Sequence, residues 1–160
     1  MIKIFFVYFF YFFSFNLYAD GIGSETDYKI PRFVSIKSND VNLRKGPSTN
    51  YPIVLKYTIK NLPVEIIEEY DLWRKIIDIN GNQGWIHKDL IKGDRFAIIN
   101  QNYNSPLQIK NKPQGRVIGT IGKNNIVKIN KCLLDWCSIS HENKQGWIEK
   151  ISLWGVYKYE

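Results

Sequence analysis

The chain has 160 residues, 44% hydrophobic and 15% aromatic, with 22 Lys and Arg against 15 Asp and Glu and a net charge of +7. This length fits one ordinary domain or two very small ones and excludes several large ones. The basic residues are scattered and no recognition motif accompanies them, so we expect no nucleic-acid partner. The charge reflects either the imprint of an AT-rich genome or a basic surface for acidic wall polymers, lipid phosphates or anionic lipid surfaces.

The N-terminal segment has the pattern of a secretory signal peptide. Lys3 is the only charge before Asp20, the run IFFVYFFYFFSFN follows it, and the small residue Ala19 precedes the polar residues. A basic start, a short apolar core and a small residue at the cut are typical of secretory signals. We therefore expect cleavage of residues 1–19 and export to the periplasm. The alternative is an uncleaved anchor, which would attach the protein to the inner membrane; no other contact with a membrane is expected.

Two tandem copies of a unit of about 60 residues follow. QGWI occurs at Gln83–Ile86 and again at Gln145–Ile148, and VEIIEEYDLWRKI from Val64 aligns with VKINKCLLDWCSI from Val127 without a gap. A repeat that occurs only twice excludes a long solenoid and predicts two small domains. We expect an N-terminal linker at 20–31, a first domain at 32–93, a second domain at 94–154 and a C-terminal tail at 155–160.

Each copy is predicted to be a small, partly open β-barrel. Short β-branched runs alternate with turns, and no segment has a sustained 3.6-residue periodicity. Asn80-Gly81, between WRKIIDI and GWI, favours a tight type I′ hairpin turn. HKDLI, after the first QGWI, has the pattern of one helical or 3₁₀ turn. The fold class is therefore all-β with minor 3₁₀ or helical turns.

Four tryptophans occupy matching places in the two copies. They are Trp73 and Trp85 in the first copy and Trp136 and Trp147 in the second. A barrel of about 60 residues is marginal by itself, and burial of one large aromatic side chain contributes a few kcal/mol. We therefore expect a packing role for these residues, with a ligand platform as the alternative.

The segment LRKGPSTNYP is predicted to form a stiff loop that presents Arg44 and Tyr51. Gly46 permits a backbone conformation that other residues avoid, and Pro47 and Pro52 fix φ. The loop either shapes the barrel or recognises a ligand.

The two cysteines are predicted to form a structural disulfide, because an even count in an exported chain favours pairing. In the repeat alignment, Cys132 matches Glu69 and Cys137 matches Arg74. Opposed residues of an antiparallel pair have Cβ atoms about 4.5–5.5 Å apart, close to the separation that a disulfide needs. We therefore predict a Cys132–Cys137 disulfide in the second copy and a Glu69–Arg74 ion pair at the same place in the first.

No constellation of catalytic or metal-binding residues is visible. Cys137 and His141 do not make a convincing nucleophile pair, since His141 lies in a predicted turn and Cys137 is expected to be oxidised. We interpret His87 as solvent-facing, and Glu68, Glu69 and Asp71 as solvated turn residues that do not pair as an acid/base couple. The two repeats leave no room for a catalytic domain. We expect a chain that is not an enzyme and that needs no cofactor and no metal.

The segment SNDVNLRKGPSTNYPIV (Ser38–Val54) resembles the start of bacterial SH3-like (SH3b) domains. In that family a Trp hairpin and a Gly-Trp-(Val/Ile) strand follow, as in DLWRKI and QGWIHKDLI here. Residues 32–157 resemble exported tandem SH3-like proteins of unknown function from alphaproteobacteria, whose second copy has counterparts of CLLDWC and SLWGVY. The resemblance implies two tandem SH3-like barrels. The second copy departs from it, with LQIKNKPQGRVIG in place of the Asn-Leu-Arg-x-Gly-Pro-Ser motif.

The resemblance implies a binding or scaffold protein of the periplasm whose ligand is peptidoglycan or another extended peptide. Aromatic faces and a guanidinium suit such a ligand and its carboxylate. The candidate ligand-binding residues all lie in the first copy: Arg44, Tyr51, Tyr70, Trp73 and Trp85. The alternatives are an adaptor between envelope proteins and an accessory subunit of a cell-wall hydrolase.

Overall fold

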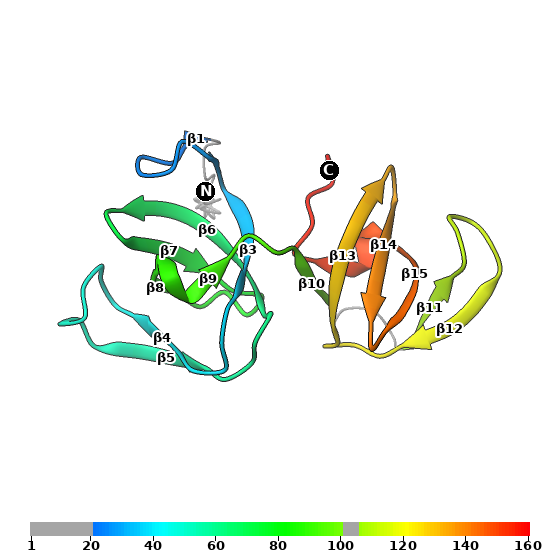
Figure 1. Cartoon of the computed structure of the whole chain (residues 1–160), viewed down its shortest axis with the longest axis horizontal. Helices are drawn as coiled ribbons and strands as arrows, with labels where there is room; N and C mark the ends of the chain where they lie inside the picture. The colour runs from blue at the N-terminus through cyan, green and yellow to red at the C-terminus, as the bar shows by residue number, and fades with distance from the viewer. Residues whose placement is uncertain (1–20, 101–105) are drawn as a thin grey trace, which may run out of the picture.

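The computed structural model describes residues 21–100 and 106–160, which form two small β-barrels in tandem (Figure 1). The expected signal peptide, residues 1–19, lies outside the described residues. Two seven-stranded antiparallel sheets and two 3₁₀ turns of three residues account for both barrels. The all-β prediction is confirmed. No described segment is a helix of the length and apolarity that crossing a membrane requires.

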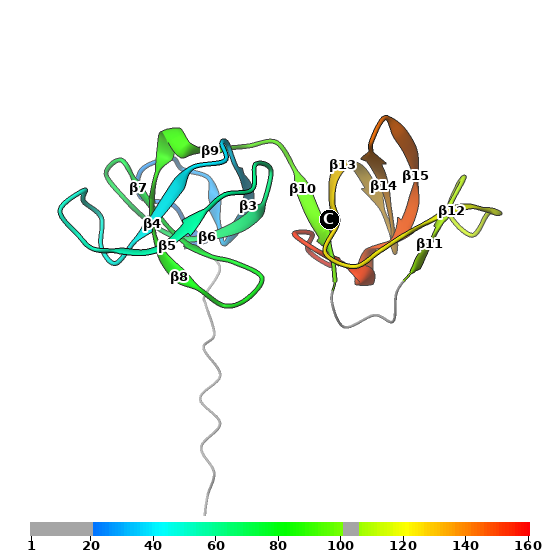
Figure 2. The same ribbon diagram turned by 90° about the horizontal axis from the view of Figure 1, so that it is seen from below.

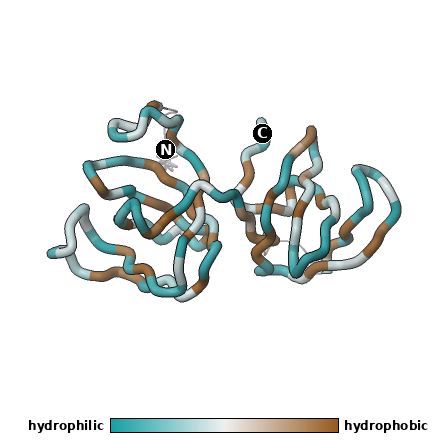
Figure 3. The backbone as a smooth tube through the Cα atoms, viewed as in Figure 1, coloured by the Kyte–Doolittle hydropathy of each residue, from teal (hydrophilic) through white to brown (hydrophobic). Residues whose placement is uncertain are grey.

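The first barrel is a sheet with the strand order β5-β4-β8-β7-β6-β3-β9. Its elements are β3 (Arg32–Ile36), β4 (Val41–Arg44), β5 (Ile53–Tyr57), β6 (Pro63–Tyr70), β7 (Trp73–Ile77), β8 (Gln83–His87), the 3₁₀ turn η1 (Lys88–Leu90) and β9 (Ile91–Lys92). Alternate residues of β4 and β7 are buried, as a period of two places them on opposite faces. Figure 3 shows hydrophobic and hydrophilic residues interspersed along the backbone of both barrels. The predicted 3₁₀ turn after QGWI is confirmed.

The second barrel repeats this order with β12-β11-β15-β14-β13-β10-β16. Its elements are β10 (Phe96–Ile99), β11 (Leu107–Lys110), β12 (Val117–Ile121), β13 (Ile126–Leu133), β14 (Trp136–His141), β15 (Lys144–Glu149), the 3₁₀ turn η2 (Lys150–Ser152) and β16 (Leu153–Trp154). Each strand matches its counterpart in the first barrel, so each residue in these strands can be compared with the residue at the equivalent position of the other copy. The β11–β12 hairpin extends away from β13, β14 and β15 in both views (Figures 1 and 2).

The turn between β7 and β8 differs from the expected type I′ turn. Gly81 donates to the carbonyl of Asp78 at 3.0 Å, so Ile79 and Asn80 are the central residues. Gly81 alone has a positive φ here, at 84°, whereas a type I′ turn needs positive φ at both central residues. The cause is the buried Asp78 carboxylate, whose Oδ1 accepts from the N–H groups of Asn80 and Asn82 at 2.9 Å each.

The two barrels have different bonds at equivalent positions within their hairpins, as predicted. Glu69 is the Cα partner of Arg74, and Oε1 of Glu69 lies 3.4 Å from Nε of Arg74. Cys132 is the Cα partner of Cys137, and the two form a disulfide with a Cα–Cα distance of 4.1 Å. Both the ion pair and the disulfide are confirmed.

Reduction of the disulfide is expected to lower the free energy of unfolding of the second barrel by about 2 kcal/mol. The bond closes a short loop, and the chain-entropy model assigns such a loop a stabilisation of that order. Urea unfolding with and without a reductant measures this difference. The variant Cys132→Ala/Cys137→Ala is the control, because its unfolding is expected to be insensitive to reductant. A wild-type curve equally insensitive would contradict the prediction.

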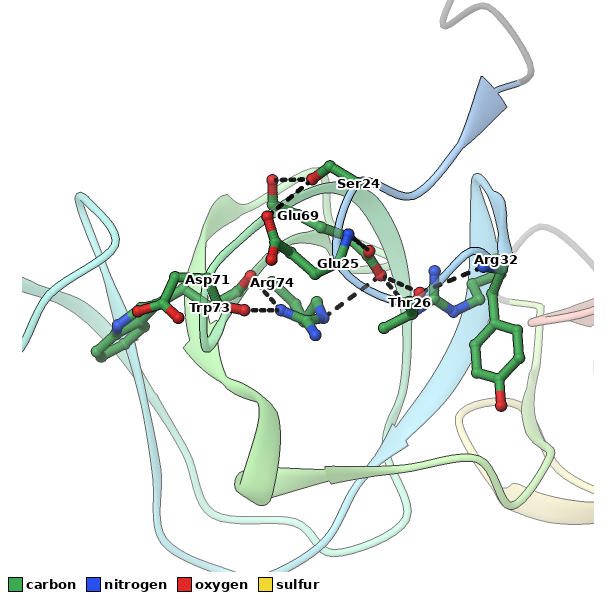
Figure 4. A network of polar contacts seen from close by, with 9 residues as sticks. Ser24, Glu25, Thr26, Arg32, Glu69, Asp71, Trp73 and Arg74 are labelled. Carbon is green, nitrogen blue, oxygen red and sulfur yellow. Dashed lines mark hydrogen bonds and ion pairs between the residues drawn. The ribbon is translucent and has the colours of Figure 1, made fainter.

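A short N-terminal hairpin covers Glu69 (Figure 4). The hairpin, β1 (Gly21–Ile22) and β2 (Lys29–Ile30), falls within the segment expected to be a linker, residues 20–31. Gly23 is required there, since a Cβ on it would lie 2.4 Å from a carboxylate oxygen of Glu69.

The Glu69 carboxylate is the centre of a buried polar network, so the interpretation of Glu69 as a solvated turn residue is wrong. Its Oε1 accepts from Nη2 of Arg32 at 2.6 Å and from Oγ1 of Thr26 at 2.8 Å, and its Oε2 accepts from the N–H of Glu25 at 3.0 Å. Burial acts to raise the pKa of Glu69, but these hydrogen bonds outweigh it and hold the pKa below its usual value. The network attaches the N-terminal hairpin to the first barrel.

The C-terminal segment joins the two barrels. The ring of Phe33 in β3 lies 5.1 Å from that of Trp154 and 4.7 Å from that of Tyr157. The hydroxyl of Tyr157 donates to Oε1 of Glu65 at 2.6 Å, and Nη2 of Arg95 donates to the carbonyl of Gly155 at 2.7 Å. Burial, followed by the hydrogen bond to Glu65, raises the pKa of Tyr157, so its hydroxyl remains a donor at neutral pH. The barrels therefore pack through a shared aromatic contact.

Candidate functional site

The outward face of β4, β8, β7 and β6 brings the candidate residues of the first barrel together. Arg44 pairs with Trp85, Trp85 with Lys75, and Lys75 with Glu68, so these four side chains form one cross-strand row. Residues that pair across neighbouring antiparallel strands point to the same face of the sheet. Leu43, Ile76 and Ile86 are fully buried on the opposite face, within the core. The face therefore carries aromatic and charged groups side by side.

A second row on this face consists of Tyr70, Trp73 and His87. Trp73 pairs with both Tyr70 and His87. The Trp73 ring is half-buried and meets the His87 ring edge to face, with the centroids 5.4 Å apart. Trp73 thus packs on its neighbour in the sheet and retains part of its surface in solvent.

Trp85 is nearly covered, although it points outward. Only 8% of its surface is exposed, while Tyr70 is 59% exposed and its ring lies edge-on to Trp85 at 6.5 Å. The accessible aromatic surface at this place therefore belongs mainly to Tyr70 rather than to Trp85.

Arg44 organises the loop that follows β4. Its Nη1 donates to the carbonyls of Thr49 and Tyr51, at 2.9 Å each. The Tyr51 ring packs on Gly46, where a Cβ would lie 2.7 Å from ring atoms, and Tyr51 is 47% exposed. The guanidinium thus fixes the loop shape and keeps a positive charge beside Trp85.

Three further residues of this face were not among the predicted site residues. Lys75 and Glu68 form an ion pair of 3.0 Å, and His87 packs on Trp73. Nδ1 of His87 accepts from the N–H of Asp89 at 3.4 Å. Counting the register outward from the β7–β8 turn would have placed His87 opposite Trp73 and Lys75 opposite Trp85.

The corresponding face of the second barrel holds Lys110, Trp147, Ser138 and Lys131 in one row. The ammonium of Lys131 lies 5.7 Å from the Trp147 ring centroid, and that of Lys110 lies 4.8 Å from the Trp136 centroid. Aromatic rings attract cations in this arrangement. Neither barrel, over residues 21–100 and 106–160, gathers three or more His, Cys, Asp or Glu side chains in a group that could hold a metal ion.

The match to a known protein family agrees with this architecture. A family model described as a bacterial SH3 domain matches residues 37–93 and 111–155. No curated protein matches the chain. Two solved structures, NlpC1 and NlpC2 from Trichomonas vaginalis, are each 17% identical to it, with TM-scores of 0.33 and 0.34. The matches cover 82% and 79% of this chain but only 48% and 49% of those proteins, so the chain spans about half their length.

Proposed function

The chain belongs to the bacterial SH3 domain family, and from this we propose that it is a non-catalytic binding or scaffold protein of the cell envelope. Its ligand is a cell-wall peptide or another extended peptide, and its place is the periplasm. The outward face of the first barrel, with Arg44, Tyr51, Tyr70, Trp73 and Trp85, is the proposed ligand site. Two tandem modules of this size suit a protein that holds its partners in place.

The exposed ring of Tyr70 next to the nearly buried Trp85 is the observation that carries this proposal. A tyrosine that is 59% exposed and that meets a tryptophan edge to face offers a large contact area at a low cost in side-chain entropy. The fixed guanidinium of Arg44 and the Lys75–Glu68 pair add polar partners in the neighbouring row. Aromatic rings flanked by polar groups are typical of surfaces that bind extended peptides.

Binding to purified sacculi tests this proposal. We expect wild-type protein to co-sediment with sacculi, and Tyr70→Ala to weaken this retention about five- to tenfold, since a central aromatic anchor contributes more than 1 kcal/mol. Tyr28→Ala is the matched control, because Tyr28 is 65% exposed but lies on the N-terminal hairpin.

Two outcomes would overturn the wall ligand. Retention that modest salt abolishes and that Tyr70→Ala leaves unchanged would reveal diffuse charge attraction only. An absence of retention even at low salt would favour an envelope protein as the partner.

A further inference from the structure

The second barrel contains a groove beside Trp136. A cavity of about 720 Å³ is lined by Lys110, Asp135, Trp136, Glu149, Val156 and Lys158, among others. A second hollow of about 250 Å³ shares Lys110, Trp136 and Glu149 with it and continues to Pro106 and Leu107. Sites for small molecules occupy about 300–1,000 Å³. We refer to these two adjoining hollows, which share three lining residues, as the groove.

One loop beside the groove differs between the two barrels. Lys110 takes the place of Arg44, since each is the Cα partner of the Trp in its QGWI motif. The connection from Lys110 to Val117 is two residues shorter than that from Arg44 to Ile53. The shorter loop has no tyrosine to match Tyr51, and the Lys110 ammonium lies over the Trp136 ring instead of holding loop carbonyls.

The groove also differs in charge from the same place in the first barrel. Asp135 replaces Leu72, because their carbonyls accept from the equivalent N–H groups of Lys150 and Lys88. Glu149 replaces His87, since each is the partner of the Trp that begins the preceding strand. The second barrel thus has two carboxylates where the first has a leucine and a histidine.

The charges around the groove are not paired with one another. Within the described parts of the chain, Asp135, Glu149, Lys110 and Lys158 take part in no ion pair within 4.0 Å. Lys150 differs from them, because it is only 7% exposed and its ammonium donates to the carbonyls of Lys158 and Glu160. Lys150 therefore holds the tail that forms one wall, and the other four charges remain available to a ligand.

We propose that this groove is a second ligand site, which takes a short peptide with both a free amine and a free carboxylate. A purely cationic ligand would face Lys110 and Lys158, and a purely anionic one would face Asp135 and Glu149. A zwitterionic peptide pairs its amine with the two carboxylates and its carboxylate with the two lysines, while Trp136 packs against its apolar part. The inference goes beyond the proposed function, which concerns the first barrel, and shares with it only that the ligand is a peptide.

Titration of ¹⁵N-labelled protein with trialanine tests the inference. We expect the indole N–H resonance of Trp136 to shift. Acetylation of the peptide amine and amidation of its carboxylate are each expected to weaken binding about three- to fivefold, because each removes the contribution of one exposed ion pair. Asp135→Asn and Glu149→Gln are expected to remove the preference for the free amine. Leu72→Asn, at the matching position of the first barrel, is the control and keeps that preference.

Two results overturn this inference. One is an unshifted Trp136 resonance at about 10 mM peptide, a concentration that would reveal even millimolar affinity. The other is equal binding of the free and the doubly blocked peptide. If either result is obtained while the protein still binds sacculi through Tyr70, the second site is rejected and the proposed function of the first barrel stands. A Trp136 shift without such binding to sacculi rejects the proposed function of the first barrel alone.

Discussion

Replacement of Glu69 by alanine is expected to lower the free energy of unfolding of the first barrel by about 3–5 kcal/mol. The Glu69 side chain is fully buried and faces Arg74, whose side chain is only 5% exposed, as well as Arg32. Its removal leaves a buried guanidinium without a counter-charge, and breaking a buried pair in this way costs about that much. The loss approaches the whole stability of so small a domain, and it also frees the N-terminal hairpin.

Glu68→Ala is the matched control for this prediction. Glu68 is the neighbouring residue and forms an ion pair of 3.0 Å with Lys75, but its side chain is 53% exposed. An exposed pair contributes about 1 kcal/mol or less. Urea unfolding of the wild type and both variants measures the difference. Equal effects of the two substitutions would contradict the buried role of Glu69.

The same network predicts how stability depends on pH. The folded-state pKa of Glu69 is lowered, so its contribution is complete above the unfolded pKa of about 4.3 and disappears as the pH falls through the lower folded value. Wild-type protein is therefore expected to lose stability in acid below about pH 4. Glu69→Gln has no charge to lose and is expected to show a smaller decline over that range.

Phe33→Ala is expected to uncouple the two barrels. Phe33 contacts both Trp154 and Tyr157, which belong to the C-terminal segment. Truncation of a half-buried phenylalanine costs about 2–3 kcal/mol, somewhat less than at a fully buried site. Because this ring joins the barrels, we expect the single unfolding transition of the wild type to separate into two.

Differential scanning calorimetry measures this uncoupling. Ile118→Ala removes an apolar side chain of the second barrel that is 49% exposed and lies on β12, away from the shared aromatic contact, so it serves as the control. A single transition for Phe33→Ala, at the wild-type temperature, would show that the barrels do not depend on this contact.

The sequence was sufficient for the features that depend on local pattern and on register. The gapless alignment from Val64 and Val127 fixed which residues oppose each other in two hairpins, and it thereby predicted both the Glu69–Arg74 pair and the Cys132–Cys137 disulfide. The position of the 3₁₀ turn followed from its place after the QGWI strand. Such features can be predicted once it is known which strands pair with each other.

Contacts between distant segments could not be predicted in this way. Nothing in the sequence around Gly23 shows that it approaches Glu69, because that contact depends on how the hairpin folds back over the barrel. Strand alternation places Trp85 on the outward face, but it does not show that Trp85 is nearly buried there or that the Tyr70 ring meets it edge to face. The turn after β7 was missed because the buried Asp78 side chain, rather than Asn80-Gly81, determines its type.

The groove of the second barrel is a further example. The missing Asn-Leu-Arg-x-Gly-Pro-Ser motif indicated only that the second copy departs from the family pattern at this loop. The cavity is lined both by the loop after Lys110 and by the C-terminal segment. These two parts are far apart in the sequence, and only the fold brings them together.

Titration of ¹⁵N-labelled protein with soluble muropeptides shows directly where a wall peptide binds. We expect progressive shifts of the indole resonances of Trp73 and Trp85 and of the backbone amide of Tyr70, and the loss of these shifts in Tyr70→Ala. Unshifted Trp73, Trp85 and Tyr70 resonances at millimolar muropeptide would contradict the first barrel as a site for wall peptides.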